Sequence, residues 1–192
     1  MYFYRRFQKY MTMINIPVVN LADFVSGDPQ LRSNFVNSLG RAYEEVGFVA
    51  VKNHGISDDL IADLYDYVRK FFNFPAETKL KYEKKELAGQ RGYTSFGREH
   101  AKGYDAPDLK EFFQYGQTVE DADTISKEYP QNVKVEELPG FDDTMYRAYR
   151  SFEKSGRELL KAIALFLGLD ENYFDSHIHN GNSILRAIHY PP

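Results

Sequence analysis

The segment 183–190 carries two side chains that could bind a small anion. Its apolar and β-branched residues predict a strand, and side chains alternate between strand faces, so Arg186 and Tyr190 share one face with Ile188. A buried guanidinium or phenol needs an anionic or hydrogen-bonding partner, and a carboxylate-bearing ligand would supply one. The pattern leaves an alternative open, in which this face is solvated. The core would then be contacted by the opposite residues, Leu185, Ala187 and His189.

His177 and His179 are the closest pair of histidines in the sequence. In a strand, residues two apart face the same way, so the pair could give two ligands to a metal ion. A third ligand would have to come from Asp175, His189 or a distant carboxylate. The pair lies beside the turn-forming segment 180–182, which favours a solvated loop. We therefore interpret this pair as part of a solvated loop and not as a metal site.

The segment 86–108 forms a second group of residues suited to ligand contact. Glycines and a proline punctuate it without a clear period, which predicts an ordered loop. Long loops in compact domains are often functional. This loop holds an unusual share of aromatic and cationic residues: Arg91, Tyr93, Phe96, Arg98, His100 and Tyr104. Contact with a substrate is the functional interpretation, and an ordinary surface loop is the alternative.

A short strand between two helices is predicted to organise the chain. Residues 48–51 form an apolar, β-forming run that predicts a buried strand. Gly47 and Gly55 on either side fit sharp reversals with positive φ. Such a unit occurs in many domains and specifies no chemistry by itself.

Amphipathic helices are predicted on both sides of this strand and near the end of the chain. The first covers 29–46 and has Asp28 as its N-cap, the second begins after Ser57, and the third covers 142–167 and ends at Gly168. We also predict a short charged surface helix and two further strands, at 76–85, 14–21 and 111–116.

Composition limits the classes of partner. The chain has 192 residues, 43% hydrophobic and 27% charged, which suits one globular domain. Its net charge of −4 gives no general basic surface for nucleic acid, and no apolar run approaches the ~20 residues of a membrane span. The absence of cysteine excludes thiolate chemistry and makes a reducing cytoplasm the default location. We expect a small-molecule partner, while the oligomeric state stays open.

Six segments in a fixed order carry a family resemblance. They are IPVVNL at 16–21, GFVAVKNHGI at 47–56, FFNFPAETK at 71–79, RGY at 91–93, DLKEFF at 108–113 and LRAIHYPP at 185–192. With these segments the chain resembles the isopenicillin N synthase-like family of iron(II)- and 2-oxoglutarate-dependent oxygenases. The resemblance implies an α+β fold, with helices packed around part of a double-stranded β-helix (jelly-roll) barrel. It also divides the chain into an N-terminal extension, 1–12, and the N-terminal part of a dioxygenase, 13–192.

The resemblance implies cofactors that this chain would not hold alone. In the family the iron ligands are a His-x-Asp pair and a later His, which follow the Tyr-Pro-Pro strand, and no His-x-Asp occurs here. We therefore expect the iron(II) ligands, the main 2-oxoglutarate site and the remaining jelly-roll strands beyond Pro192. The implied reaction is hydroxylation, desaturation or ring closure of a small molecule, by the complete protein only. An oxidase that does not use 2-oxoglutarate, and a non-catalytic binding module made of this region alone, are the alternatives.

The resemblance also assigns roles to single residues. Tyr190 matches the family tyrosine near 2-oxoglutarate, and Arg186 matches a position, often basic, at the edge of the active site. Arg91 and Tyr93 match the loop that covers the substrate, and Phe96 extends that expected substrate contact. Ile188 departs from the asparagine found at its position in many plant members.

Overall fold

The structure is a computed structural model that describes residues 15–99, 108–118 and 129–191. The predicted extension 1–12 and the loop residues His100 and Tyr104 therefore lie outside the described residues. The chain divides into two compact units, which are described separately. Unit 1 comprises residues up to Gly55 together with Ser155–Ser176, and unit 2 comprises Ile56–Lys154 together with the residues from His177 onward.

Unit 1 is a two-stranded parallel sheet packed with helices. Its elements are β1 (Val18–Asn20), α2 (Leu21–Val25), α3 (Pro29–Glu45), β2 (Ala50–Lys52) and the second half of α6 (Phe141–Phe166). The strands pair with Val19 opposite Val51. The buried residues of its core are Val19, Leu21, Phe24, Phe35, Leu39 and Ala162.

Local signals fix the ends of the helices and turns in unit 1. The Asp28 carboxylate accepts hydrogen bonds from the backbone N–H groups of Gln30 and Leu31, so the predicted N-cap of α3 is confirmed. Gly47 has φ +80°, as predicted for a reversal. Gly40 allows close packing within the unit, because a Cβ there would clash with the ring of Phe166.

Two predictions in unit 1 are wrong in detail. The strand at 48–51 is not a buried one: β2 begins at Ala50, and Phe48 is 70% exposed. A strand is buried on both faces only where layers cover both, and here only alternate residues reach the core. The strand predicted at 14–21 is reduced to β1, because Asn20 caps helix α2 and the chain turns helical at Leu21.

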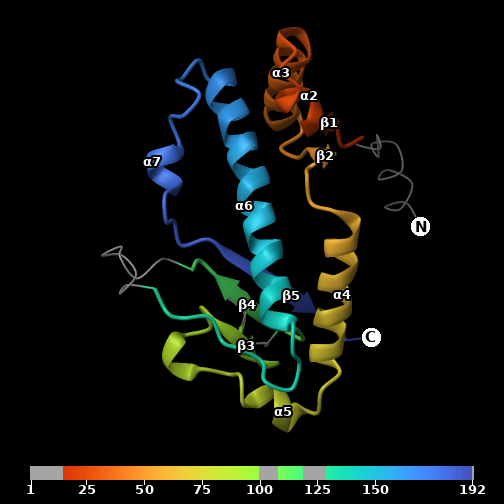
Figure 1. The fold of residues 1–192 in the computed structure, drawn as a ribbon, viewed down its shortest axis with the longest axis vertical. Helices are drawn as coiled ribbons and strands as arrows, with labels where there is room; N and C mark the ends of the chain where they lie inside the picture. Colours follow the sequence, from red (N-terminus) through yellow and green to blue (C-terminus); the bar gives the residue numbers. More distant parts are fainter. Residues whose placement is uncertain (1–14, 100–107, 119–128, 192) are drawn as a thin grey trace, which may run out of the picture. The chain divides into compact units, whose positions relative to one another are not determined.

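Unit 2 is a three-stranded antiparallel sheet with helices against it (Figure 1). Its elements are α4 (Asp58–Phe72), α5 (Ala76–Leu80), the 3-10 helix η1 (Lys85–Leu87), β3 (Gly92–Thr94), β4 (Glu111–Gly116), the first half of α6 and β5 (Ile184–His189). The short α7 (Asp175–Ile178) spans the boundary between the units, which lies between Ser176 and His177. The strand order is β3-β4-β5. Phe113 lies opposite Tyr93 on one side and Ala187 on the other, so these three side chains share a face.

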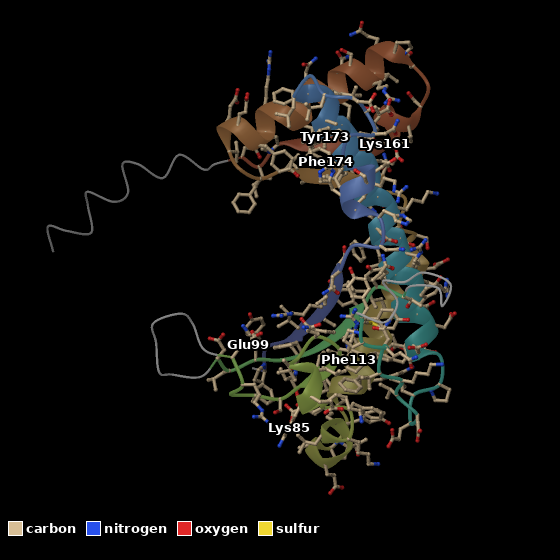
Figure 2. All side chains as sticks on the ribbon, turned by 90° about the vertical axis from the view of Figure 1, so that its left-hand side faces the viewer. Lys85, Glu99, Phe113, Lys161, Tyr173 and Phe174 are labelled. Atoms are coloured by element: carbon tan, nitrogen blue, oxygen red, sulfur yellow. The ribbon has the colours of Figure 1, made fainter. Side chains whose placement is uncertain are left out.

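That shared face forms the main core of unit 2, and we call it the helix-covered face. Phe113 is fully buried there and packs with residues of α4 and α6 (Figure 2). Phe71 of α4 lies at the centre, with its ring centroid 5.0 Å from that of Phe113 and 5.5 Å from that of Phe141. Leu185 and Ala187 of β5 pack against the same cluster. Close aromatic packing of this kind stabilises the position of the sheet on its helices.

Unit 2 confirms most of the predicted elements and corrects two. The N-cap Ser57 and the strand 111–116 are confirmed. The segment 86–108 is not a loop throughout, since it contains part of η1 and all of β3. The short helix α5 ends at Leu80 and is not a surface helix on all sides, because Lys79 is buried. Among the described residues, no helix is both long enough and apolar enough to cross a bilayer.

Candidate functional site

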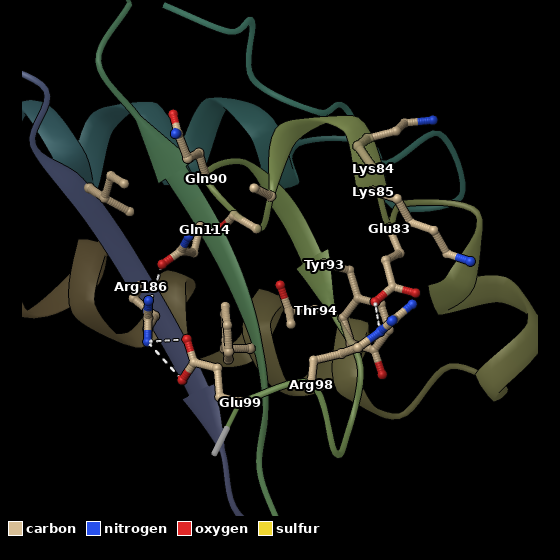
Figure 3. A pocket seen from close by; sticks show the side chains of 14 residues that line it. Glu83, Lys84, Lys85, Gln90, Tyr93, Thr94, Arg98, Glu99, Gln114 and Arg186 are labelled. Atoms are coloured by element: carbon tan, nitrogen blue, oxygen red, sulfur yellow. Dashed lines mark hydrogen bonds and ion pairs between the residues drawn. The ribbon is translucent and has the colours of Figure 1, made fainter. Parts of the chain in front are cut away.

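The sheet of unit 2 has a second face, which points away from the aromatic core. Alternation places Thr94, Phe112, Gln114, Arg186 and Ile188 on it, with Phe112 opposite Ile188 and Gln114 opposite Arg186. We call these five residues the open face. A pocket of about 460 Å³ lies over it, and the segments 83–90 and 98–99 form the other walls (Figure 3).

Arg186 is the best-defined side chain in this pocket. Its Nε donates to Gln114 Oε1 at 2.6 Å, and its Cζ lies 4.2 Å from the centroid of the Phe112 ring. Its Nη1 lies 3.4 Å from Glu99 Oε1 (Figure 3). Gln114 is held in turn, because its amide donates to the carbonyl of Gly89. These contacts fix the plane of the guanidinium above the sheet.

The charge of the pocket lining is predominantly positive. Four basic and two acidic side chains line it: Lys84, Lys85, Arg98 and Arg186, and Glu83 and Glu99. Glu99 also forms an ion pair with Lys110, with Oε2 2.9 Å from Lys110 Nζ. Burial would raise the pKa of Glu83, but hydrogen bonds from Ser95 and the contact with Arg98 outweigh it, so its pKa lies below its ordinary value. Both carboxylates are paired with basic side chains, and the surplus of cations in the lining suits an anionic ligand.

Arg91, a predicted substrate contact, lies elsewhere. It is fully buried, and its guanidinium donates to the carbonyl of Gln90 at 2.8 Å and to Asn182 Oδ1 at 3.4 Å. It sits against Gly116, where a Cβ would clash with the guanidinium carbon of Arg91. Burial lowers the pKa of Arg91. The Arg91 side chain is therefore enclosed, and Arg91 is not among the residues that line the pocket.

The other predicted site residues are dispersed. Tyr93 contributes to the pocket wall, but its phenol turns away to the helix-covered face and donates to Glu111. Phe96 is partly exposed and is not among the residues of the pocket lining. Tyr190 follows the last residue of β5 and is 66% exposed. Of the predicted set, Arg186 and Tyr93 line this pocket.

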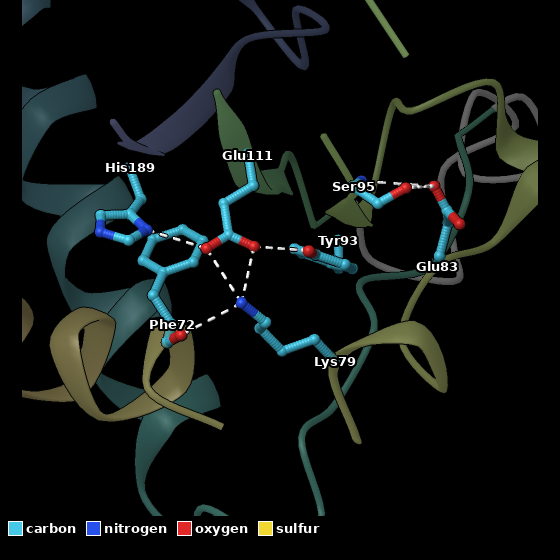
Figure 4. Close-up of polar contacts among 7 residues, drawn as sticks. All are labelled: Phe72, Lys79, Glu83, Tyr93, Ser95, Glu111 and His189. Carbon is cyan, nitrogen blue, oxygen red and sulfur yellow. Dashed lines mark hydrogen bonds and ion pairs between the residues drawn. The ribbon is translucent and has the colours of Figure 1, made fainter. Parts of the chain in front are cut away.

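Sequence reasoning missed a buried polar cluster on the helix-covered face (Figure 4). Glu111 is only 1% exposed, and its carboxylate accepts hydrogen bonds from three side chains. The donors are Lys79 Nζ, at 2.7 and 2.9 Å from the two oxygens, Tyr93 Oη at 2.5 Å and His189 Nδ1 at 2.8 Å. Burial alone would raise the pKa of Glu111, but these three donors outweigh it and lower the pKa. Burial and the same carboxylate raise the pKa of Tyr93. The available signal was alternation, because Glu111 lies two residues before the core residue Phe113.

The described residues do not form an iron site. Among them, no three His, Asp or Glu side chains are grouped so that they could hold a metal ion. His177 lies in the short helix α7 and not in a strand, so the strand geometry that could have paired it with His179 is absent. A site for iron(II) therefore does not fit the residues described here.

Comparison with known proteins identifies the family. The sequence model described as "non-haem dioxygenase in morphine synthesis N-terminal" matches residues 16–137. The chain is 30% identical to the 2-oxoglutarate-dependent dioxygenase ecdK of Aspergillus rugulosus, over 93% of this chain and 57% of that protein. It is 32% identical to the proline hydroxylase buaE of Petromyces alliaceus, over 90% of this chain and 54% of that protein.

Solved structures give the same result. A 2OG-Fe(II) oxygenase family protein from Caulobacter crescentus superposes with a TM-score of 0.82 at 33% identity, covering 92% of this chain and 56% of that one. A full-length Neurospora crassa protein, solved in complex with alpha-KG and thymine, gives a TM-score of 0.74 at 30% identity, with 92% and 55% coverage.

The chain therefore belongs to the isopenicillin N synthase-like family of iron(II)- and 2-oxoglutarate-dependent oxygenases, and it matches their N-terminal part. It spans about half the length of the relatives and structures that it matches. The predicted fold class, α+β with helices around part of a jelly-roll barrel, is confirmed by these neighbours.

Proposed function

We propose that this chain forms the N-terminal part of an oxygenase that uses iron(II) and 2-oxoglutarate to hydroxylate, desaturate or cyclise a small molecule. The iron ligands and the remaining jelly-roll strands would follow Pro192, and catalysis would require them. One observation carries the proposal: β3, β4 and β5 have one face covered by helices and another that opens into a cationic pocket. A strand in a barrel that binds a ligand also has two different faces, since its outer face packs against helices and its inner face contacts the ligand.

Arg186 is the proposed substrate contact. Its guanidinium is already oriented by Gln114 and Phe112, so it could receive a carboxylate or another anionic group with little loss of side-chain entropy. Glu99 Oε1 lies 3.4 Å from Arg186 Nη1, which is long for an ion pair, so such a ligand could replace Glu99. Arg91 is left out of the proposed site because its guanidinium is buried and is not part of the pocket lining.

Tyr190 is the proposed contact of 2-oxoglutarate. Alternation along β5 places Arg186 and Ile188 on the open face, and continuation of the strand by one residue past His189 would place Tyr190 beside them. Bound iron(II) and 2-oxoglutarate supply the oxidising chemistry of this family. The part of this chain would be to orient the two ligands and to exclude water from one side of the barrel.

The test is Tyr190→Phe in the complete protein. The change keeps the ring and removes only the hydroxyl, so we expect weaker use of 2-oxoglutarate by about 1–3 kcal/mol, the cost of an unpaired buried partner. Tyr65→Phe is the matched control, because Tyr65 is also 66% exposed in the described structure but lies on α4. The dependence of turnover on 2-oxoglutarate concentration is measured for all three proteins. An unchanged dependence in Tyr190→Phe would refute the role of Tyr190. A complete protein that turns over its substrate without 2-oxoglutarate would favour the oxidase alternative, and one with no turnover would favour a binding module.

A further inference from the structure

The residue directly before Tyr190 is held by two contacts. His189 is the last residue of β5, and its Nδ1 lies 2.8 Å from Glu111 Oε1. A carboxylate can only accept hydrogen bonds, so the imidazole donates from Nδ1. The ring also stacks on Phe72, with centroids 5.1 Å apart and planes at 24°. Its polar edge and its flat face are therefore both fixed (Figure 4).

Glu111 is itself fixed from other elements. Lys79 of α5 donates to both carboxylate oxygens and also to the carbonyl of Phe72 at the end of α4, at 3.1 Å. Tyr93 of β3 donates to Oε2. The carboxylate is buried and has donors on both oxygens, so it cannot turn without breaking several charge-assisted hydrogen bonds. His189 is consequently tied, directly or through Glu111, to four elements outside β5: α4, α5, β3 and β4.

We propose that Glu111, acting through His189, is a positioning residue for Tyr190. This inference rests on the proposed contact between Tyr190 and 2-oxoglutarate. Successive strand side chains point to opposite faces, so holding His189 toward the helix-covered face directs the next side chain to the open face. The tie matters at this position because the ladder between β4 and β5 ends at His189. Strand ends without such a contact open readily.

Two substitutions of His189 separate hydrogen bonding from packing. His189→Leu keeps an apolar side chain against Phe72 and removes the donor, whereas His189→Asn places an amide N–H near the position of Nδ1 and keeps it. Tyr82→Phe is the control for general stability. The change removes only the Tyr82 hydroxyl, which contacts Glu137 and the backbone N–H of Glu136, and it keeps the ring in the aromatic core of unit 2. Glu136 and Glu137 both precede α6.

Two measurements are made on the complete protein. The first is amide hydrogen exchange of residues 186–190 in the iron-free protein, and the second is the KM for 2-oxoglutarate and the kcat of the iron-loaded protein. For His189→Leu we expect faster exchange in 186–190 and a KM raised about tenfold, the size expected for one lost hydrogen bond to a charged group, with a smaller change in kcat. His189→Asn and Tyr82→Phe should resemble the wild type in both measurements.

The outcomes are separable. The proposal is overturned if His189→Leu leaves the exchange of 186–190 unchanged, if Tyr82→Phe raises KM equally, or if exchange rises while KM stays the same. A protein that does not use 2-oxoglutarate would refute the proposed function. The exchange measurement would still decide whether the hydrogen bond between His189 and Glu111 holds the end of β5.

Discussion

Lys79→Met tests the energetics of the buried cluster in unit 2. Lys79 and Glu111 have side chains that are 9% and 1% exposed, and their charged atoms are 2.7 Å apart. Removing the cation leaves a buried carboxylate with only Tyr93 and His189 as donors. Loss of one partner of a buried ion pair costs about 3–5 kcal/mol, and the remaining donors favour the lower end of that range.

The loss should depend on pH in a defined direction. In the wild type the pKa of Glu111 lies below its ordinary value, so its stabilising contribution is complete at neutral pH and is lost as the pH falls through its folded-state pKa. In Lys79→Met the strongest of the donors is absent, and burial should raise the pKa of Glu111 instead. As the pH falls, protonation of Glu111 removes the unpaired buried charge of the variant, and this source of destabilisation disappears. The difference in stability between wild type and variant should therefore shrink between pH 7 and pH 4.

The assay is urea denaturation followed by far-UV circular dichroism, since the chain has no tryptophan. The double variant Lys79→Met, Glu111→Gln is the control. It removes both charges. The glutamine amide keeps one acceptor oxygen, and its NH2 group can donate to the Tyr93 hydroxyl, which also accepts hydrogen bonds, so the double variant should recover most of the lost stability. A loss that is independent of pH, or a double variant as unstable as the single one, would show that the cluster contributes through packing and not through charge.

Two further predictions concern backbone positions. Gly116→Ala places a Cβ against the guanidinium carbon of the buried Arg91, so thermal unfolding should show a loss of about 1–3 kcal/mol from overpacking, and an unchanged melting temperature would mean that Arg91 moves freely. Asp28→Ala removes the acceptor for the N–H groups of Gln30 and Leu31, at 2.7 and 3.0 Å, and should cost about 1 kcal/mol in urea unfolding, whereas Asp28→Ser should retain most of the stability.

The sequence predicted the features that local chemistry determines. Asp28 and Ser57 are N-caps as expected, because capping needs only a side-chain oxygen and the next two or three backbone N–H groups. Gly47 and Gly55 have positive φ for a similarly local reason. The alternation of β5 also separated its two faces correctly, with Leu185 against the core.

Features that depend on distant residues were not predictable in the same way. Alternation could not say which face of β5 meets helices, since that depends on where α4 and α6 pack. The burial of Lys79 depends on Glu111, which follows it by 32 residues along the chain. Arg91 looked like a loop cation suited to a ligand, but Gly116 provides space for it inside the unit. Composition and residue spacing do not show which distant residues will pair in the folded chain.

The division of helix α6 between the units has a consequence for how the chain is made. Leu39 and Ala162 belong to one core, so unit 1 cannot complete that core while its early residues alone have left the ribosome. Unit 2 likewise awaits β5 at the end of the described chain. The core of unit 1 therefore stays incomplete until the second half of α6 has been made, and part of its apolar surface, such as that of Leu39, stays uncovered until then. Nascent chains of this protein should consequently depend on chaperone binding more than chains whose units are contiguous in sequence.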